Sequence, residues 1–165
     1  MTRRSFTGSL ALAVLAVDQA SKLQARIHLN DPVALGPFLD LRLGFNSGVS
    51  FGLFAGAGDL ARWLLVAGTA AVSSWLLAWM WREPRLSVAA PLALIVGGAL
   101  GNLSDRLLRG VVTDFIDIHM GDFHWPTFNL ADTAITVGVA WLLLTSLGRQ
   151  ASAATQSSPP AKGHP

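Results

Sequence analysis

The chain has no cysteine and few charged residues. Of its 165 residues, none is cysteine and 13% are Asp, Glu, Lys or Arg, whereas soluble domains average about 25% charged residues. The lack of cysteine excludes disulfides, a cysteine nucleophile and a thiolate metal site, and it leaves the redox compartment open. Hydrophobic residues make up 52% and the mean hydropathy is +0.47, so the composition indicates a membrane protein of one domain. The formal charge of +2 is too small to predict a nucleic-acid-binding surface.

Four apolar stretches are candidates for membrane-spanning helices, because a helix needs about 20 apolar residues to cross the hydrocarbon core. They are residues 6–17, 63–81, 86–103 and 130–147. The first and last reach a spanning length only if the helices also carry Asp18 and Asp132. We therefore expect an all-α integral membrane protein with four transmembrane helices.

The first stretch has a second interpretation as a signal peptide. Arg3 and Arg4 before a short apolar run are typical of a cleavable signal, even of a twin-arginine one. However, a cleaved segment has no reason to end in the polar sequence DQASK at 18–22, and the rest of the chain is itself hydrophobic. We therefore expect this stretch to remain as a helix.

The basic residues indicate an orientation. With four spans, both termini lie on one side of the membrane, and that side carries its basic residues on short segments: Arg3, Arg4, Arg82, Arg85, Arg149 and Lys162. The longer segments 24–61 and 105–129 carry as many basic residues together with most of the acids. The positive-inside rule counts Lys and Arg near helix ends, so it favours cytoplasmic termini with the two long segments outside.

Both outer segments have patterns of ordered structure. Residues 37–54 alternate apolar with polar residues and break at Asn46, Ser47 and Gly48, which predicts a strand pair with a turn, a small periplasmic β element between helices 1 and 2. Residues 110–128 mix β-branched and aromatic residues with aspartates. Residues 150–165 are small, polar and proline-containing, so we expect a disordered tail after a single membrane-embedded domain of residues 1–149.

Acidic residues stand at the ends of several apolar stretches. A charge at membrane depth costs roughly 2.5–3.5 kcal/mol and usually marks function. Asp114 and Asp132 are joined by a segment that leaves one helix end and returns to another, so both carboxyls can meet at the outer boundary. Two adjacent carboxyls cannot both ionise, which provides a base for water and an acid for a carbonyl or amine, as in aspartic proteases. On spacing alone, Asp105, Asp117 and Asp122 remain alternatives.

Five short motifs run through the chain from Asp18 to Asp132. They are DQASK at 18–22, NSGVSFG at 46–52, GGALGNLSDR at 97–106, VVTDF at 111–115 and FNLAD at 128–132. In this order and spacing they resemble the lipoprotein signal peptidases (signal peptidase II), the intramembrane aspartic proteases of bacterial lipoprotein maturation. The resemblance implies a monomeric, multi-pass inner-membrane peptidase with cytoplasmic termini and an active site at the outer, periplasmic face. It also implies prolipoprotein substrates, cut before a diacylglyceryl-modified cysteine among the membrane lipids, with Asp114 and Asp132 as the catalytic pair and no metal or cofactor.

The resemblance further implies supporting or substrate-binding roles for seven residues. They are Asn46, Asn102, Asp105, Arg106, Asn129, Asp18 and Lys22. The amides of Asn102 and Asn129 both donate and accept, so we expect them to bind substrate backbone or to orient the aspartates. Neighbours on a helix do not face each other, so we expect Asp105 to point toward the site and Arg106 toward the outer loops.

Two local patterns concern helix packing. Asp18 and Lys22, at i and i+4, form an expected exposed pair worth about 0.2–0.5 kcal/mol, and a structural clasp is as consistent with them as a direct role. Gly97 and Gly101 form a GxxxG face, with Gly98 beside it, which predicts close helix packing that places the residues following it.

Three other interpretations remain. His119 and His124 suggest zinc ligands, but the spacing is unconvincing without further ligands, and solvated loop histidines explain them better. Ser21 and Lys22 suggest a Ser/Lys protease, yet helix neighbours point apart. A small transporter or channel would use helix-end acids as an ion path, but it has no need for the paired strings GNLSD and FNLAD.

Overall fold

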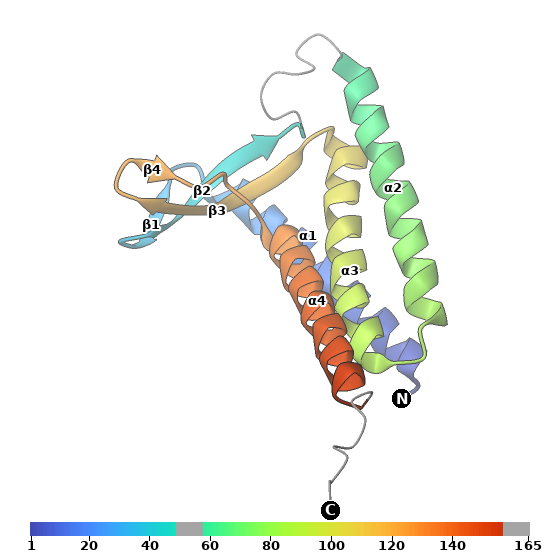
Figure 1. Cartoon of the computed structure of the whole chain (residues 1–165). Helices are drawn as coiled ribbons and strands as arrows, with labels where there is room; N and C mark the ends of the chain where they lie inside the picture. Colours follow the sequence, from blue (N-terminus) through green and yellow to red (C-terminus); the bar gives the residue numbers. More distant parts are fainter. Residues whose placement is uncertain (49–57, 157–165) are drawn as a thin grey trace, which may run out of the picture.

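The chain folds into long helices with a small sheet at one end (Figure 1). The computed structural model describes residues 1–48 and 58–156, and within them it has four helices and four strands. The helices are α1 (Arg3–His28), α2 (Gly58–Arg82), α3 (Leu86–Arg109) and α4 (Leu130–Gln156). The strands are β1 (Val33–Gly36), β2 (Leu39–Asn46), β3 (Val112–Met120) and β4 (Phe123–His124).

The central helix of the bundle is α3, which packs against α1, α2 and α4. Within the most apolar window of each helix, 72% of α3 is buried, compared with 17% of α2 and 11% of α4. The apolar outer faces of α2 and α4 expose large side chains such as Trp75 and Leu144. Such continuous apolar surface on hydrogen-bonded helices suits contact with lipid.

Glycines let α3 approach its neighbours closely, as the GxxxG pattern predicted. A Cβ on Gly97 would lie 2.6 Å from the carbonyl oxygen of Ala11 in α1, and one on Gly101 would overlap the carboxylate of Asp18. On the other side of α3, a Cβ on Gly98 would lie 2.5 Å from the carbonyl oxygen of Ala131 in α4. The three glycines therefore hold α1 and α4 against α3 just before the end where the sheet begins.

Three helices are long and apolar enough to cross a membrane: Arg62–Arg82, Leu86–Arg109 and Leu130–Arg149. These confirm three of the predicted spans. Helix α1 does not meet the same criteria of composition, although its 26 residues extend roughly 39 Å, more than the roughly 30 Å of hydrocarbon. The predicted disorder after residue 149 is wrong for residues 150–156, which continue α4 to Gln156, while residues 157–165 lie outside the described part.

The sheet joins the two long segments that connect the helices, the one before α2 and the one before α4. Its strand order is β1-β2-β3-β4, all neighbours antiparallel, so the central pair joins the segment before α2 to the segment before α4. The strand predicted within residues 37–54 is confirmed as β2, but its partners are β1 and β3, and residues 49–54 lie outside the described part. The predicted turn follows β2, where Gly48 has φ 77° and its N–H donates to Asn46 Oδ1 at 2.7 Å.

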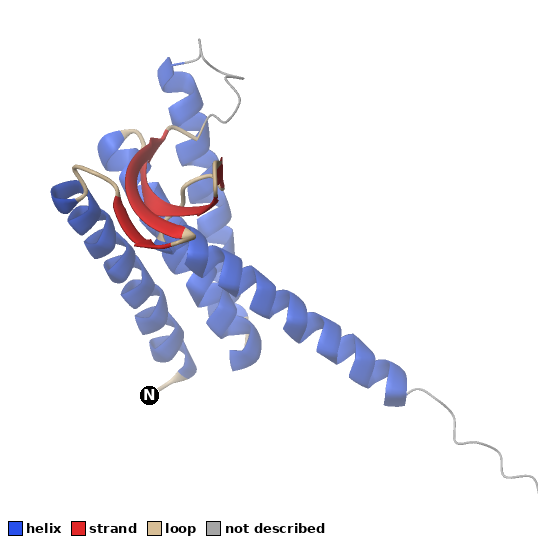
Figure 2. Cartoon of the chain, turned by 90° about the vertical axis from the view of Figure 1, so that its left-hand side faces the viewer, coloured by secondary structure: helices blue, strands red, loops and turns tan. Residues whose placement is uncertain are grey.

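The sheet lies at one end of the helices, and the start of α1 and the end of α4 lie at the other (Figure 1). The strands curve across the end of the bundle, and α1 and α4 diverge from them toward the termini (Figure 2). The first residues of β3 are buried against the helices, whereas its last residues and β4 are mostly exposed. The buried half of β3 is therefore where the sheet meets the ends of α3 and α4.

Candidate active site

Asp114 lies in the buried half of β3. Helix α3 ends at Gly110, whose φ of 81° is left-handed and lets the chain turn directly into the strand. Asp114 is opposite Gly44 of β2 in the ladder and is only 2% exposed. The strand thus carries this carboxyl away from solvent and toward the helices.

Asp132 lies in the first turn of α4, where a reciprocal cap holds it. The N–H of Asp132 donates to Asn129 Oδ1 at 3.0 Å, and the N–H of Asn129 donates to Asp132 Oδ2 at 3.2 Å. This is the geometry of a capping box, here with Asn and Asp in place of the more usual Ser or Thr and Glu. The motif FNLAD therefore encodes a helix start that also fixes the carboxylate.

Asn129 connects the two aspartates. Its backbone holds Asp132, and its side-chain Nδ2 donates to Asp114 Oδ1 at 2.7 Å and to Asn102 Oδ1 at 3.2 Å. Asn129 is fully buried. One side chain at the start of α4 thereby brings the two predicted catalytic carboxyls to a common centre.

Asn102 of α3 provides the second donor to Asp132. Its Nδ2 donates to Asp132 Oδ1 at 2.8 Å, and its Oδ1 accepts from Lys22 Nζ at 2.8 Å. An ammonium group only donates, so it must face the amide oxygen and leaves the amide nitrogen for the carboxylate. Lys22 therefore orients Asn102 toward Asp132.

Beneath this centre lies a buried ion cluster. Lys22 Nζ is 2.9 Å from Asp18 Oδ2 and 3.8 Å from Asp105 Oδ2, and all three side chains have 0% exposure. The expectation of an exposed Asp18–Lys22 pair is therefore wrong. It failed because Gly101, which has no side chain, lets α1 approach α3 at the level of Asp18.

Each acid of this cluster also fixes the backbone next to one candidate catalytic aspartate. Asp18 Oδ1 accepts from the N–H of Ala131 at 3.0 Å, one residue before Asp132. Asp105 Oδ2 accepts from the N–H of Thr113 at 2.9 Å, one residue before Asp114. The cluster thus sets the separation of the two carboxyls through the main chain.

Arginines complete the charge balance around Asp105. Arg109 Nη1 lies 3.1 Å and Arg26 Nη1 lies 3.7 Å from Asp105 Oδ1, and Arg26 also donates to Thr113 Oγ1 at 2.7 Å. Asp105 therefore faces cations and the start of β3, and it supports the site from behind. Asp105 was expected to point toward the site, and it contacts the residue next to Asp114.

Arg106 and Asn46 border the aspartates. Arg106 interacts electrostatically with both Asp114 and Asp132, and its guanidinium lies beside Gly48, where Nη2 would be 3.5 Å from an added Cβ. Its buried Nε has no hydrogen-bond partner among the described residues. Asn46 is exposed at the end of β2, and its side chain hydrogen-bonds to Asp114.

The environment of Asp114 favours its protonated form. Burial raises the pKa of Asp114 above its ordinary value, and the negative charge of Asp132 acts in the same direction. Hydrogen bonds from Asn129 and Asn46 and the charge of Lys22 oppose the shift without reversing it. The pair therefore contains one carboxyl that resists ionisation.

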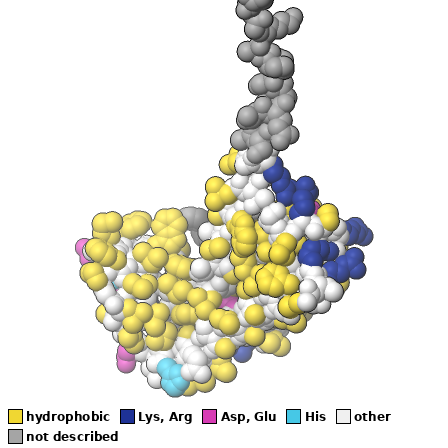
Figure 3. All heavy atoms as spheres, turned by 90° about the horizontal axis from the view of Figure 1, so that it is seen from below, with side chains coloured by type: hydrophobic (Ala, Val, Ile, Leu, Met, Phe, Trp, Pro, Cys, Tyr) yellow, Lys and Arg dark blue, Asp and Glu magenta, His cyan; other side chains and the backbone are white. Residues whose placement is uncertain are grey.

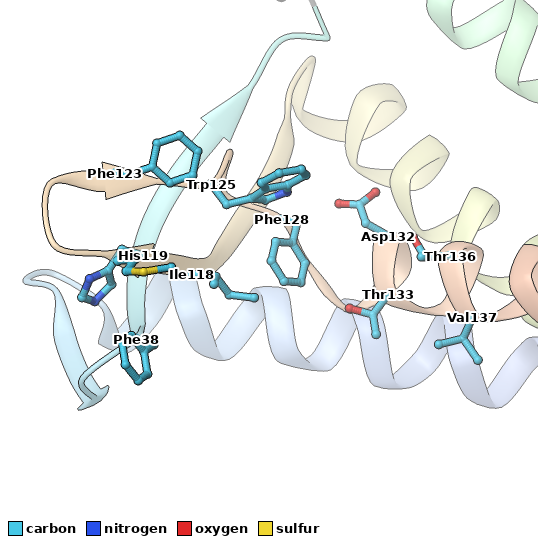
Figure 4. A pocket seen from close by; sticks show the side chains of 11 residues that line it. Phe38, Ile118, His119, Phe123, Trp125, Phe128, Asp132, Thr133, Thr136 and Val137 are labelled. Atoms are coloured by element: carbon cyan, nitrogen blue, oxygen red, sulfur yellow. The ribbon is translucent and has the colours of Figure 1, made fainter.

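An apolar groove leads to Asp132 but not to Asp114. It has a volume of about 640 Å³ and lies between β3, the segment after β4, and α4. In Figure 4 the aromatic side chains Trp125 and Phe128 separate its outer part from Asp132, and Thr133 and Val137 of α4 form its other end. Asp132 is thus accessible along a hydrophobic path.

Sequence reasoning did not identify several residues of the site. Gln19 Nε2 donates to the carbonyl of Gly101 at 3.0 Å and so joins α1 to α3, and its place in DQASK was the available signal. Trp125 lines the groove beside Asp132. The histidines are not loop residues, since His119 and His124 pair between β3 and β4 with ring centroids 5.0 Å apart.

Comparisons with known proteins show the family to which the chain belongs. A family model described as signal peptidase (SPase) II matches residues 10–148. A lipoprotein signal peptidase of Methylorubrum extorquens is 45% identical over 158 residues, which cover 93% of this chain and 92% of that protein. One of Beijerinckia indica is 41% identical over 169 residues, covering 99% of each chain. A bacterial membrane enzyme solved by the in meso method at 1.9 Å resolution has a TM-score of 0.77 and 27% identity, covering 87% of this chain and 93% of that one. This chain belongs to the signal peptidase II family.

Proposed function

We propose that the protein is an intramembrane aspartic endopeptidase that removes the signal peptide from prolipoproteins. The observation that carries the proposal is the pair of carboxyls joined through Asn129, of which Asp114 is buried with a raised pKa and Asp132 lines an apolar groove. Two carboxyls in unlike environments are typical of an acid and a base that work together. Family membership supports the same activity.

The roles follow from the two environments. Asp114 carries the shared proton, and Asp132, on the groove side, takes a proton from water as that water attacks the scissile carbonyl carbon. Asp114 gives its proton to the carbonyl oxygen, which forms a tetrahedral diol. Asp132 then gives its proton to the leaving amine as the C–N bond breaks, and Asp114 recovers a proton from the diol. Both carboxyls return to their starting state, and no covalent enzyme intermediate forms.

The groove supports a lipid-bearing substrate. Its lining is mainly aromatic and aliphatic, and the outer faces of α2 and α4 are apolar. A diacylglyceryl cysteine would place its acyl chains on such surfaces while the preceding peptide bond reaches Asp132. We propose cleavage before that cysteine, by a monomer that needs no metal or cofactor.

We further propose four membrane spans, with α1 as the first, and a single peptidase domain of residues 1–149. The start of α1 and the end of α4 lie at one end of the helices and the sheet lies at the other (Figure 1). The basic residues on short segments at the end that carries the termini favour the cytoplasm for that end. This orientation puts the dyad and the sheet at the outer face of a bacterial inner membrane.

The test uses purified enzyme with a diacylglyceryl-modified prolipoprotein and its unmodified form. We expect Asp114→Asn and Asp132→Asn each to lower kcat at least about 100-fold, the smaller end of general acid–base contributions. Asp122→Asn, which replaces an exposed acid, is the matched control and keeps full activity. In Asp114→Asn the new amide oxygen can still accept from Asn129, so thermal unfolding of that variant shows no loss of stability near neutral pH.

Two results would contradict the proposal in different ways. Full activity of either dyad variant removes the aspartic mechanism. Equal cleavage of the lipidated and unlipidated substrates leaves the mechanism standing but removes the substrate assignment.

A further inference from the structure

A second groove lies at the end of the bundle that carries the termini, far from the dyad. It has a volume of about 780 Å³ and lies between the start of α1 and the end of α2, within the roughly 300–1,000 Å³ typical of ligand pockets. Its lining residues are Arg4, Ser5, Gly8, Ser9, Leu12, Ala78, Trp81 and Arg82. The catalytic proposal uses none of them.

Small side chains create the space. Gly8, Ser9 and Ala78 leave a trough where α1 and α2 approach each other, and a Cβ on Gly8 would meet nothing within 4 Å. Leu12, which is 66% exposed, adds an apolar side chain to the lining one turn further along α1. The trough therefore runs from a polar mouth at the helix ends into the apolar part of the bundle surface.

The mouth carries two cations whose charge is not balanced. Among the described residues, the side chains of Arg4 and Arg82 make no ion pair or hydrogen bond, and both are exposed. The nearest acid in sequence, Glu83, is buried, and its carboxylate is held by Arg85 at 2.7 Å. No carboxylate in the described part of the chain therefore competes for Arg4 and Arg82.

The helix ends add to the positive potential. The guanidinium of Arg3 donates to the carbonyls of Met80 and Trp81, each at 3.0 Å, which covers the negative end of α2 and ties it to α1. The N-terminus of α1, with its partial positive charge, begins beside the same mouth. Viewed from this end, Lys and Arg side chains gather on one part of the surface beside hydrophobic ones (Figure 3).

We propose that this groove binds an anionic phospholipid. The phosphate would lie between Arg4 and Arg82 with the hydroxyls of Ser5 and Ser9 as further donors, and an acyl chain would follow the trough toward Leu12. Basic pockets between transmembrane helices on the cytoplasmic side suit anionic head groups, because that leaflet carries a negative surface potential. The inference rests on the proposed orientation of the chain, and it adds a lipid site that clamps α1 to α2 at the opposite end from the dyad.

The experiment measures thermal unfolding of the full chain in a neutral detergent with added lipid. Phosphatidylglycerol should raise Tm in a saturable manner, by roughly 5–10 °C at about 100 times its Kd. Phosphatidylcholine with the same acyl chains, and inorganic phosphate at equal concentration, should leave Tm unchanged. An equal rise with phosphatidylcholine or with phosphate would overturn the assignment to an anionic lipid.

Variants locate the effect. The variants Arg4→Gln and Arg82→Gln, singly and together, should weaken or lose the rise, whereas Arg149→Gln, which removes a charge from the same end outside the groove, should keep it. Gly8→Leu should also lose the rise while all charges stay in place, and it replaces a helical glycine by a better helix former at an open position, so it folds. A full rise in Arg4→Gln/Arg82→Gln or in Gly8→Leu would refute the site.

The outcome is separable from the peptidase proposal. Asp114→Asn should respond to phosphatidylglycerol as the wild type does, because the dyad lies at the other end of the helices. Cleavage without a rise in Tm on adding phosphatidylglycerol would contradict only the proposed lipid site. A rise in Tm without cleavage would contradict only the peptidase assignment.

Discussion

Replacing Lys22 by methionine tests how the buried ion cluster supports the dyad. Methionine keeps much of the length and apolar stem of lysine but removes the ammonium that lies 2.9 Å from Asp18 and 2.8 Å from Asn102. Removing one partner of a buried pair leaves an uncompensated charge and destabilises by about 3–5 kcal/mol. Asp18 keeps its bonds from Gln19 and Ala131, so we expect the lower part of this range.

The expected change is large enough to measure. For a chain of this size about 3 kcal/mol corresponds to a fall in Tm of roughly 6–12 °C. Arg42→Met is the control: Arg42 is 51% exposed and lies 3.7 Å from Asp117, and that buried carboxylate keeps His124 Nδ1 at 2.9 Å, so we expect a smaller fall in Tm. Adding Asp18→Asn to Lys22→Met should restore part of the loss, since the buried negative charge is then gone.

Activity provides a second measurement, because a change in fold stability alone would not alter kcat at temperatures well below Tm. Without Lys22, only the longer bond from Asn129 Nδ2, at 3.2 Å, holds the oxygen of Asn102 away from Asp132, so the donor to that carboxylate is lost in part of the molecules. At temperatures well below Tm we expect kcat to fall while KM stays unchanged, because the groove lies on the other side of Asp132. A Tm for Lys22→Met equal to that of Arg42→Met, together with an unchanged kcat, would refute the reasoning.

Four further predictions address topology, packing, proton chemistry and metal dependence. In spheroplasts, Ser47→Cys should react with a membrane-impermeant thiol reagent and Ser87→Cys should not, and the reverse labelling would invert the orientation. Gly98→Leu pushes a side chain against a carbonyl of α4 and should destabilise by about 1–3 kcal/mol with loss of activity, whereas Gly68→Leu, at an open position, should do neither; equal behaviour of the two would disprove the packing argument. The activity should follow a bell-shaped pH profile and fall on the alkaline side as Asp114 ionises. Because folding raises the pKa of Asp114, its protonated form contributes to the stability of the fold at low pH. That contribution is lost as the pH rises through the pKa of the folded state. EDTA should have no effect on activity, and a loss restored by zinc would reject the aspartic mechanism and favour the two strand histidines.

Residues whose roles depend on local pattern were predictable from the sequence. The helices 63–81, 86–103 and 130–147 follow from long, predominantly apolar runs, and the glycine face of α3 follows from a spacing typical of close helix packing. The turn at Asn46–Gly48 follows from residues that tolerate left-handed backbone. In each case the information lies within a few consecutive residues.

Features that depend on distant partners were not predictable in the same way. Strands β2 and β3 pair although α2 and α3 lie between them in the sequence, and the residues of either strand alone do not predict which strand it pairs with. The burial of Lys22 was missed because an i, i+4 pair looks the same whether it faces solvent or Gly101 of another helix. Tertiary contact, absent from a pattern of one helix, decides whether such a pair is a weak surface feature or a costly buried one.

The two buried asparagines show what the dyad requires of its neighbours. Asn102 must accept from the ammonium of Lys22 and donate to Asp132, and Asn129 must accept from the N–H of Asp132 and donate to Asp114. An amide offers both functions on two separate atoms without adding charge, whereas the hydroxyl of serine or threonine must serve both from one oxygen on a shorter side chain. Aspartate at either position would add a carboxylate that raises repulsion around the pair, and leucine would leave a buried donor or acceptor unpaired, at about 1–3 kcal/mol or more for charged partners. The side chain of glutamine is one methylene longer, so it would have to displace the very groups it serves. The paired strings GNLSD and FNLAD therefore each supply an amide of the one length that joins the ion cluster to the carboxyls.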